Sequence, residues 1–170
     1  VKILAFDTST AWLSVAVQDG TRLVERDEHV GNAHSSRLLP LVDELLAEAG
    51  LALTDLDAIA FGAGPGSFTG VRIACSVAQG LGLGAGRPLV PVSTLAALAQ
   101  TAWRARGWSR VVACLDARMR EVYVASLERV GSDWCEAVSP AVSPPSAVVV
   151  PSPSGEWFGA GDGFAAYPEL

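Results

Sequence analysis

The chain has few of the residue types from which metal and catalytic sites are usually built. Its three cysteines include no Cys-x-x-Cys pair, which argues against a disulfide framework and a cysteine-based zinc site. The two histidines, His29 and His34, are five residues apart, so neither His-x-x-x-His nor His-Glu-x-x-His occurs. We therefore predict no metal site. A Ser-His-Asp triad needs only proximity in space and stays open, but no sequence feature points to one.

Positive charge and long apolar runs are also scarce. Lys2 is the only lysine, and the net charge of -6 argues against autonomous binding to nucleic-acid phosphates. The only basic concentration, which we interpret as solvated surface, comprises Arg104, Arg106, Arg110, Arg118 and Arg120. No apolar run reaches the roughly 20 residues that span a bilayer, and the N-terminal apolar stretch is too short for a secretory signal. We expect a cytoplasmic protein without membrane contact.

Half of the 170 residues are hydrophobic, enough for one core or for a core and a small second lobe. Strands are predicted at Lys2 to Thr8, Leu13 to Gln18 and Arg22 to Glu28, and their short connections make an antiparallel meander. Helical patterns then alternate with buried-strand patterns, in the order His34 to Ala49, Ala58 to Ala63, Thr69 to Leu83, Pro88 to Val92 and Thr94 to Arg106.

This α/β order is that of an actin-like ATPase or ribonuclease H-like lobe, which we assign to residues 1–106. Fold similarity alone does not give function. Two further strands, Val111 to Leu115 and Glu121 to Glu128, predict a second and smaller lobe at residues 107–170. Its Pro/Ser-rich stretch from Ser139 to Gly155 lacks helical periodicity, so the second lobe is expected to be incomplete.

A glycine-rich turn, Gly62-Ala63-Gly64-Pro65-Gly66-Ser67-Phe68-Thr69-Gly70-Val71-Arg72, joins an apolar run to a helical pattern. It has no phosphate-loop lysine, and it lacks the third glycine of a dinucleotide motif. A nucleophile elbow would need a glycine two residues before and two residues after Ser67, and neither is present. Its backbone N–H groups at a helix N-terminus favour an anion, but a tight strand-to-helix turn explains it equally well.

Asp7 ends the first strand, where actin-like ATPases place a carboxylate near metal and phosphate. The alternative is an ordinary capping residue at a strand end. Together with the glycine turn, Asp7 defines a candidate nucleotide or anion loop. Its members are Asp7, Thr8, Ser9, Gly64, Gly66, Ser67, Thr69 and Gly70.

The first two helices have more apolar surface than one sheet face requires. On the helix at His34 to Ala49, the apolar side chains span an arc of about 160°, against the roughly 100° of a surface helix. The surplus predicts a second packing surface such as a partner helix; deep burial in its own domain is the alternative. Pro40 indicates a start near Leu38 or a kink. The helix at Thr69 to Leu83 has only a narrow polar strip, so we expect it to be buried on most sides.

Three segments resemble the bacterial TsaB family, also called YeaZ: Asp7-Thr8-Ser9-Thr10, Asn32 to Pro40, and Gly64 to Arg72. The similarity continues through Pro91 to Leu95 and Asp116-Ala117-Arg118, and so covers essentially the whole chain. Two departures are Ser36, where members usually have Glu, and a length shorter than that of typical members.

The resemblance implies an actin-like ATPase fold and a role in forming threonylcarbamoyladenosine (t6A) beside the anticodon of tRNA. In that family the subunit is not the catalyst. Its paralogue TsaD transfers the threonylcarbamoyl group, and the ATPase TsaE joins the complex. The resemblance also implies a homodimer when alone, a heterodimer with TsaD, and contact with tRNA only through the complex. No cofactor is expected on this chain, while ATP is expected to be possible in the complex.

The family pairs through its first two helices. The residues expected at the partner interface are His34, Ser35, Leu38, Leu39, Val42, Leu45, Leu46, Arg72, Ser76 and Gln79. The alternative function is an ATP-binding enzyme that uses Asp7 and the glycine turn. An older association of the family with glycoproteases is disfavoured because the chain has no His-x-x-x-His motif.

Overall fold

The computed structural model describes residues 1–151 and 155–170, which form two compact units, Val1–Val92 and Ser93–Leu170. Residues 152–154 of the predicted Pro/Ser-rich stretch lie outside the described residues. In the described part of the chain, no helix combines the length and apolarity needed to cross a bilayer.

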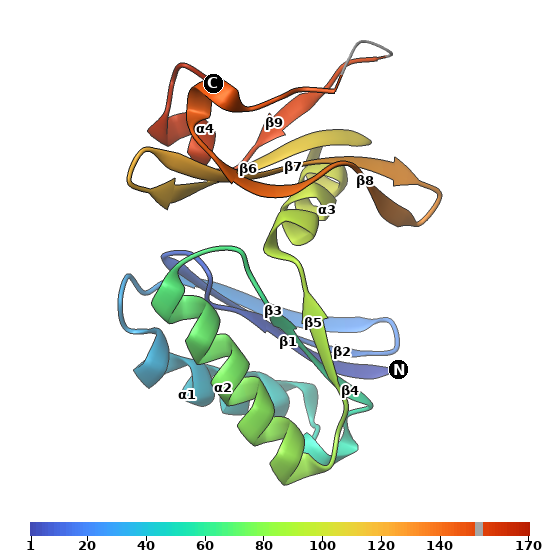
Figure 1. Ribbon diagram of the computed structural model, residues 1–170. Coiled ribbons are helices and arrows are strands. Elements are labelled where there is room, and N and C mark those ends of the chain that lie inside the picture. Colours follow the sequence, from blue (N-terminus) through green and yellow to red (C-terminus); the bar gives the residue numbers. More distant parts are fainter. Residues whose placement is uncertain (152–154) are drawn as a thin grey trace. The chain divides into compact units, whose positions relative to one another are not determined.

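The first unit is a five-stranded mixed sheet with two long helices (Figure 1). Its elements are β1 (Lys2–Asp7), β2 (Trp12–Asp19), β3 (Arg22–His29), α1 (His34–Ala49), a 3-10 turn (Leu53–Asp55), β4 (Ala58–Gly62), α2 (Phe68–Ala85) and β5 (Leu89–Val92). The strand order is β3-β2-β1-β4-β5, with β1 to β3 antiparallel and β1, β4 and β5 parallel. The predicted meander and the alternation that follows it are confirmed.

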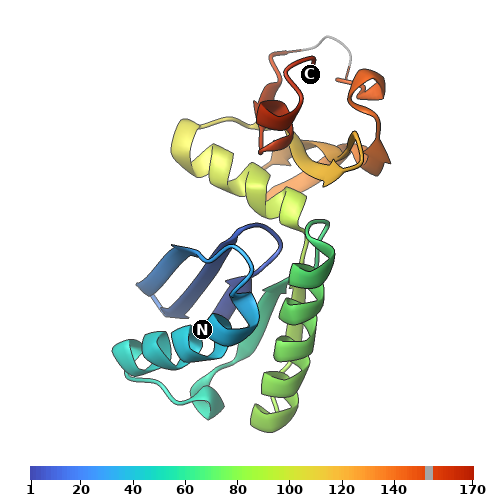
Figure 2. The ribbon, with the colours of Figure 1, turned by 90° about the vertical axis from the view of Figure 1, so that its left-hand side faces the viewer.

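Both helices pack on the same face of this sheet, side by side and in contact (Figure 2). The alternation of strand side chains sends Leu4 and Phe6 of β1, and Leu13, Val15 and Val17 of β2, toward the helices. All five are buried at this interface. Burial of apolar area on that scale is the main term that stabilises the unit.

Helix α1 begins at His34 and continues through Pro40, so the alternative start near Leu38 is wrong. Pro40 lies in the second turn, where its missing N–H removes a single backbone bond near the helix start. The predicted stop is confirmed, because Gly50 adopts a left-handed conformation with φ of 74° and caps the helix.

The second unit is a four-stranded sheet in the order β8-β7-β6-β9. Its elements are α3 (Thr94–Arg106), β6 (Arg110–Arg118), β7 (Glu121–Val130), β8 (Asp133–Ser143), a 3-10 turn (Pro145–Ala147), β9 (Phe158–Ala160) and α4 (Gly163–Ala166). Alternate residues of β6 face opposite sides. Val111, Ala113 and Leu115 pack with α3, while Val112 and Cys114 pack with the C-terminal segment.

The unit boundary differs from the predicted division between residues 106 and 107. Helix α3 packs on β6, with Leu95, Ala99 and Ala102 in the core of the second unit. The prediction assigned α3 to the first lobe because of its place in the chain. The unit to which α3 belongs depends on the sheet that its apolar face contacts. That face packs on strands that follow α3 in the sequence.

Strand β8 was not predicted, and its last residues fall in the stretch from Ser139 to Gly155 that lacks helical periodicity. It is an edge strand with most residues exposed, and it contains Pro140. An exposed edge does not need apolar alternation, and proline is tolerated there. The strand therefore has no recognisable pattern, although it pairs with β7 over most of its length.

The turn between β6 and β7 has an unusual backbone. Arg118, Met119 and Arg120 are consecutive non-glycine residues with φ of 67°, 54° and 63°. Left-handed conformation costs L-residues about 1–2 kcal/mol each. The Asp116 carboxylate offsets part of this cost by accepting hydrogen bonds from the Arg118 N–H at 2.8 Å and the Tyr167 hydroxyl at 3.1 Å.

Candidate functional site: a helix groove beside the glycine turn

The glycine turn packs against the β1–β2 turn of its own unit. The Ser67 N–H donates to the Ser9 carbonyl at 2.7 Å, and the Thr8 hydroxyl donates to the Gly70 carbonyl at 2.6 Å. An added Cβ at Gly66 would lie 2.6 Å from the Ser9 carbonyl oxygen, and one at Gly70 would collide with the Thr8 carbonyl. The glycines at these two positions are therefore required by close approach of the chain to itself.

The polar groups of the predicted nucleotide loop are brought together, but they bind one another. The Asp7 Oδ1 atom accepts from the Ser9 N–H at 2.6 Å and from its hydroxyl at 2.5 Å. The Ser67 hydroxyl caps α2 by accepting from the Gly70 N–H at 3.4 Å. Gly64 adopts φ of 93° before the helix. This arrangement is that of a capped strand-to-helix turn, and its geometry needs no bound anion.

The apolar arc of α1 is used by its own unit. Four of its leucine and valine side chains are buried in the core: Leu38, Val42, Leu45 and Leu46. His34 is also buried, with its Nε2 atom 3.3 Å from the Trp12 carbonyl oxygen. In the chain alone these five side chains leave almost no surface for a partner, so their contact with a partner stays a prediction. The arc is wide because α1 packs against both the sheet and α2. Deep burial, the alternative that the sequence left open, accounts for it.

The other predicted interface residues lie on the surface. Ser35 and Leu39 on α1, and Arg72, Ser76 and Gln79 on α2, are exposed. Leu39 is 45% exposed although it is apolar. The described surface thus keeps half of the predicted set available to a partner. All of these residues belong to the first unit.

The fully buried residues of helix α2 form a narrow stripe of small residues, Gly70, Ala74, Ala78 and Gly82. Beside this stripe, Ile73, Cys75, Val77 and Leu81 are partly buried against the core. The expectation that it is buried on most sides is wrong for the chain alone. Its opposite face carries Phe68, 70% exposed, and Leu83, 88% exposed. Single exposed apolar side chains are ordinary, so an interaction surface is indicated only where such side chains lie together.

A groove of about 390 Å³ lies between the start of α1 and this face of α2. Mainly apolar, it is lined by Ser35, Phe68, Thr69, Arg72, Ile73, Ser76 and Val77. Phe68, Ile73 and Val77 were missed as site residues. They were missed because apolar residues are expected in the core. Whether an apolar residue of this helix lies in the core or in the groove depends on its angular position around the helix axis.

The Arg72 guanidinium lies over the Phe68 ring, 3.5 Å from its centroid. The two residues are one turn apart, so the contact forms within α2. It holds a large apolar ring and a cation together at the mouth of the groove. Aromatic and arginine side chains are the types most enriched in protein interfaces.

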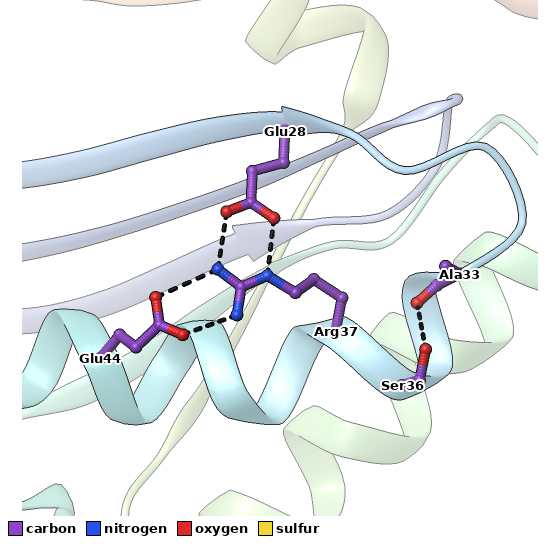
Figure 3. Close-up of polar contacts among 5 residues, drawn as sticks. All are labelled: Glu28, Ala33, Ser36, Arg37 and Glu44. Atoms are coloured by element: carbon purple, nitrogen blue, oxygen red, sulfur yellow. Dashed lines mark hydrogen bonds and ion pairs between the residues drawn. The ribbon is translucent and has the colours of Figure 1, made fainter.

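The start of α1 is fixed to β3 by Arg37 (Figure 3). Its guanidinium binds Glu28 through two hydrogen bonds of 2.7 Å and Glu44 through bonds of 2.6 and 3.1 Å. These hydrogen bonds lower the pKa of both carboxyl groups and raise the pKa of Arg37. Ser36 donates to the Ala33 carbonyl at 3.0 Å, a local contact at the start of α1.

No three His, Cys, Asp or Glu side chains converge as metal ligands within the described residues. The absence of a cofactor on this chain stays a prediction. The interpretation of the basic cluster as ordinary solvated surface also stays a prediction. Its arginines do not lie at one place in the fold. Arg104 and Arg106 end α3 next to the start of β6, whereas Arg118 and Arg120 lie at the far end of that strand.

Comparison with known proteins places these features in a family. The model of a family described as "TsaD: tRNA N6-adenosine threonylcarbamoyltransferase" matches residues 27–165. A protein of Escherichia coli K12 named tRNA threonylcarbamoyladenosine biosynthesis protein TsaB is 44% identical over 173 residues, covering 100% of this chain and 75% of the relative. A protein of the same name in Haemophilus influenzae is 42% identical and is likewise covered over 75% of its length.

The solved structure of YeaZ from Pseudomonas aeruginosa is 48% identical and superposes with a TM-score of 0.95 over 99% of this chain and 79% of that one. A second structure from that organism, described as an uncharacterized protein with similarity to peptidase YeaZ, is 47% identical at the same TM-score and coverage. The predicted actin-like, ribonuclease H-like α/β fold is confirmed. On identity, coverage and fold together, this chain belongs to the TsaB, or YeaZ, family.

Proposed function

We propose that this chain is a non-catalytic subunit of the machinery that makes t6A in tRNA, and that it pairs with and activates a TsaD-type threonylcarbamoyltransferase. Its curated relatives carry the name of a t6A biosynthesis protein. The observation that carries the pairing role is the groove between α1 and α2, with Phe68 and Leu83 held in solvent on a helix whose small residues face the core.

The partner surface in this proposal consists of the exposed predicted residues together with the groove. Ser35, Leu39, Arg72, Ser76 and Gln79 surround it, and Phe68 supplies the largest apolar side chain. Burying a residue of that size stabilises a complex by about 1.5–3 kcal/mol. In the absence of TsaD, two copies of the chain would cover the same surface as a homodimer.

Activation follows from linkage. If the groove binds the competent conformation of TsaD more tightly than the inactive one, pairing shifts TsaD toward competence by that difference in affinity. The subunit then needs no catalytic group of its own. tRNA is reached through the complex, which TsaE joins, and the reaction takes place in the cytoplasm.

The alternative of an ATP-binding enzyme rests on Asp7 and the glycine turn. The Asp7 carboxylate is engaged by Ser9, and the turn is closed by contacts within the chain. Nothing in this geometry favours the enzyme over the subunit. A peptidase role, suggested by the description of one relative, likewise has no observation in its favour here.

The test is transfer of labelled threonylcarbamoyl to unmodified tRNA by TsaD and TsaE, with and without this chain, using wild type, Phe68→Glu and Asp7→Ala. We expect strong dependence on the chain, loss of at least 30-fold in potency with Phe68→Glu, and full activity with Asp7→Ala. Leu23→Glu, on an exposed apolar residue of β3, is the matched control and should behave as wild type.

Transfer that proceeds equally well without the chain would refute the proposal. Activity lost with Asp7→Ala in a variant that remains folded would instead favour the enzyme. Circular dichroism of each variant establishes that the fold is intact.

A further inference from the structure

The polar side chains that line the groove between α1 and α2 have no partner in the chain itself. Ser35, Thr69 and Ser76 line it, and their hydroxyls make no hydrogen bond to any residue that the structure describes. Arg72 likewise forms no ion pair within the described residues. The groove therefore presents three hydroxyls and one guanidinium, all able to donate, to the molecule that occupies it.

The charge of the groove comes from one residue. Arg72 is the only charged residue among those that line the groove, and the only one in α2. On α1, Arg37, Glu44 and Glu48 are engaged in ion pairs. Asp43, the remaining charged residue of α1, is exposed and does not line the groove. The two helices thus leave the positive charge of the groove without a counter-charge.

The guanidinium is held in position by the Phe68 ring, 3.5 Å from its centroid, and a preordered group loses less entropy on binding. Ile73 and Val77 supply apolar lining beside it. A molecule that covers these apolar side chains also removes Arg72 from water. Burial of a charge is strongly unfavourable unless an opposite charge pairs with it. The occupant is therefore expected to combine an apolar group with an anion.

An acidic side chain of another protein fits this chemistry better than a nucleic acid or a second copy of the chain. A phosphate backbone is held by clustered cations, whereas this groove has one cation in a mainly apolar lining. In a two-fold pair a second copy would present the same groove, whose lining contains no acidic residue. A helix, in contrast, can place an aliphatic side chain and a carboxylate one turn apart on one face.

We propose that the groove binds a helix of the TsaD-type partner in which an aliphatic side chain contacts Ile73 and Val77, and an aspartate or glutamate one turn away pairs with Arg72. The hydroxyls of the groove are available to donate to the same carboxylate. This inference rests on the proposed pairing with TsaD and adds the chemistry by which the partner is recognised. Arg72 is then the residue that determines specificity for an acidic partner helix.

The test is a charge reversal in the full chain, measured by calorimetric titration with purified TsaD. Arg72→Met removes the charge and should raise the Kd about tenfold, and Arg72→Glu should raise it about 100-fold because two carboxylates would then face each other. Arg72→Lys retains the charge and should lose least. The matched control is Arg104→Glu on α3, an exposed position with the same change in net charge, and it should bind as wild type.

The partner's carboxylate is identified by replacing each aspartate and glutamate on the surface helices of TsaD with lysine in turn. One such variant should bind the Arg72→Glu chain with a Kd within about tenfold of the wild-type pair, and should bind the wild-type chain poorly. Circular dichroism establishes that the Arg72→Glu chain is folded. The proposal is overturned if no lysine variant restores binding, or if Arg72→Met and Arg72→Glu both bind as tightly as wild type.

The same variants test the other occupants. A loss confined to tRNA binding would assign Arg72 to a phosphate, and a loss of self-association in sedimentation equal to the loss of TsaD binding would assign it to a second copy. Either result would overturn the proposal. If the wild-type chain does not bind TsaD, the proposed function itself fails. A failure of this inference alone appears as wild-type pairing with TsaD that the Arg72→Glu chain retains.

Discussion

The Arg72 guanidinium lies 3.5 Å from the centroid of the Phe68 ring, one helical turn away, at the mouth of an exposed groove. The contact preorganises the largest apolar side chain of the groove and leaves the cation available at its edge. A cation–ring contact of this kind contributes about 0.5–2 kcal/mol, more when water is excluded.

We therefore expect Arg72→Ala to raise the Kd for the partner by about 3- to 30-fold, since the lost contact is desolvated in the complex. Unfolding of the isolated chain in urea should change little, because Arg72 is exposed. Isothermal calorimetry against TsaD gives the Kd. An Arg72→Ala chain that pairs as tightly as wild type would contradict a role for this edge of the groove.

Two adjacent leucines of α1 should behave in opposite ways. Leu38 is fully buried and Leu39 is 45% exposed. Leu38→Ala should cost about 2–5 kcal/mol in the free energy of unfolding, and Leu38→Asp should leave no folded monomer. Leu39→Ala should cost little stability but weaken pairing. Urea titrations measure the first effect and gel filtration the second; a folded Leu38→Asp chain would disprove the burial of α1.

The stability contributed by Arg37 should depend on pH. Because the hydrogen bonds of Arg37 lower the pKa of Glu28 and Glu44 below the ordinary value of 4.5, their contribution is complete above that value. It is lost as the pH falls through the lowered pKa values of the folded state. The urea midpoints of wild type and Arg37→Met should therefore differ at pH 7 and converge in acid.

The matched control for this effect is Arg26→Met, since the Arg26–Glu48 ion pair is about half exposed on both sides. Its removal should change the urea midpoint at pH 7 less than Arg37→Met does. A constant difference between wild type and Arg37→Met from pH 7 to pH 3 would contradict the assignment.

Two glycines of α2 should respond oppositely to alanine. At Gly70 the added methyl group meets the Thr8 carbonyl, whereas at Gly80 it meets open space. Gly70→Ala should destabilise the chain by about 1–3 kcal/mol, and Gly80→Ala should stabilise the helix by about 0.5–1 kcal/mol. Thermal and urea unfolding measure both changes. A Gly70→Ala chain of unchanged stability would show that the glycine turn is not held by this contact.

The elements of the first unit were predictable because their signals are local. Alternation, caps and glycine stops set the bounds of β1 and α1 to within a few residues. The assignment of α3 to a unit failed because an apolar face does not identify the sheet that it will meet. Strand β8 was missed because a solvated edge leaves the residue types nearly free.

The candidate site was predictable in location but only in part by residue. The periodicity of α1 was consistent both with a partner interface and with burial in the chain's own core. In the structure α2 packs beside α1, and Leu38, Val42 and Leu45 are buried. Phe68 was missed for the converse reason. An apolar residue at a helix start is expected to be buried, yet the glycine turn orients it into solvent.

The stripe of small residues under α2 has a consequence for how such a protein changes over time. The core takes Gly70, Ala74, Ala78 and Gly82 from this helix, with Ile73, Cys75, Val77 and Leu81 partly buried beside them. The exposed residues on the outer face therefore contribute little to folding. Substitutions there can alter which protein is recognised while the interior stays intact. Lineages that diverge in their partners can thus keep one scaffold and revise a single exposed helix face.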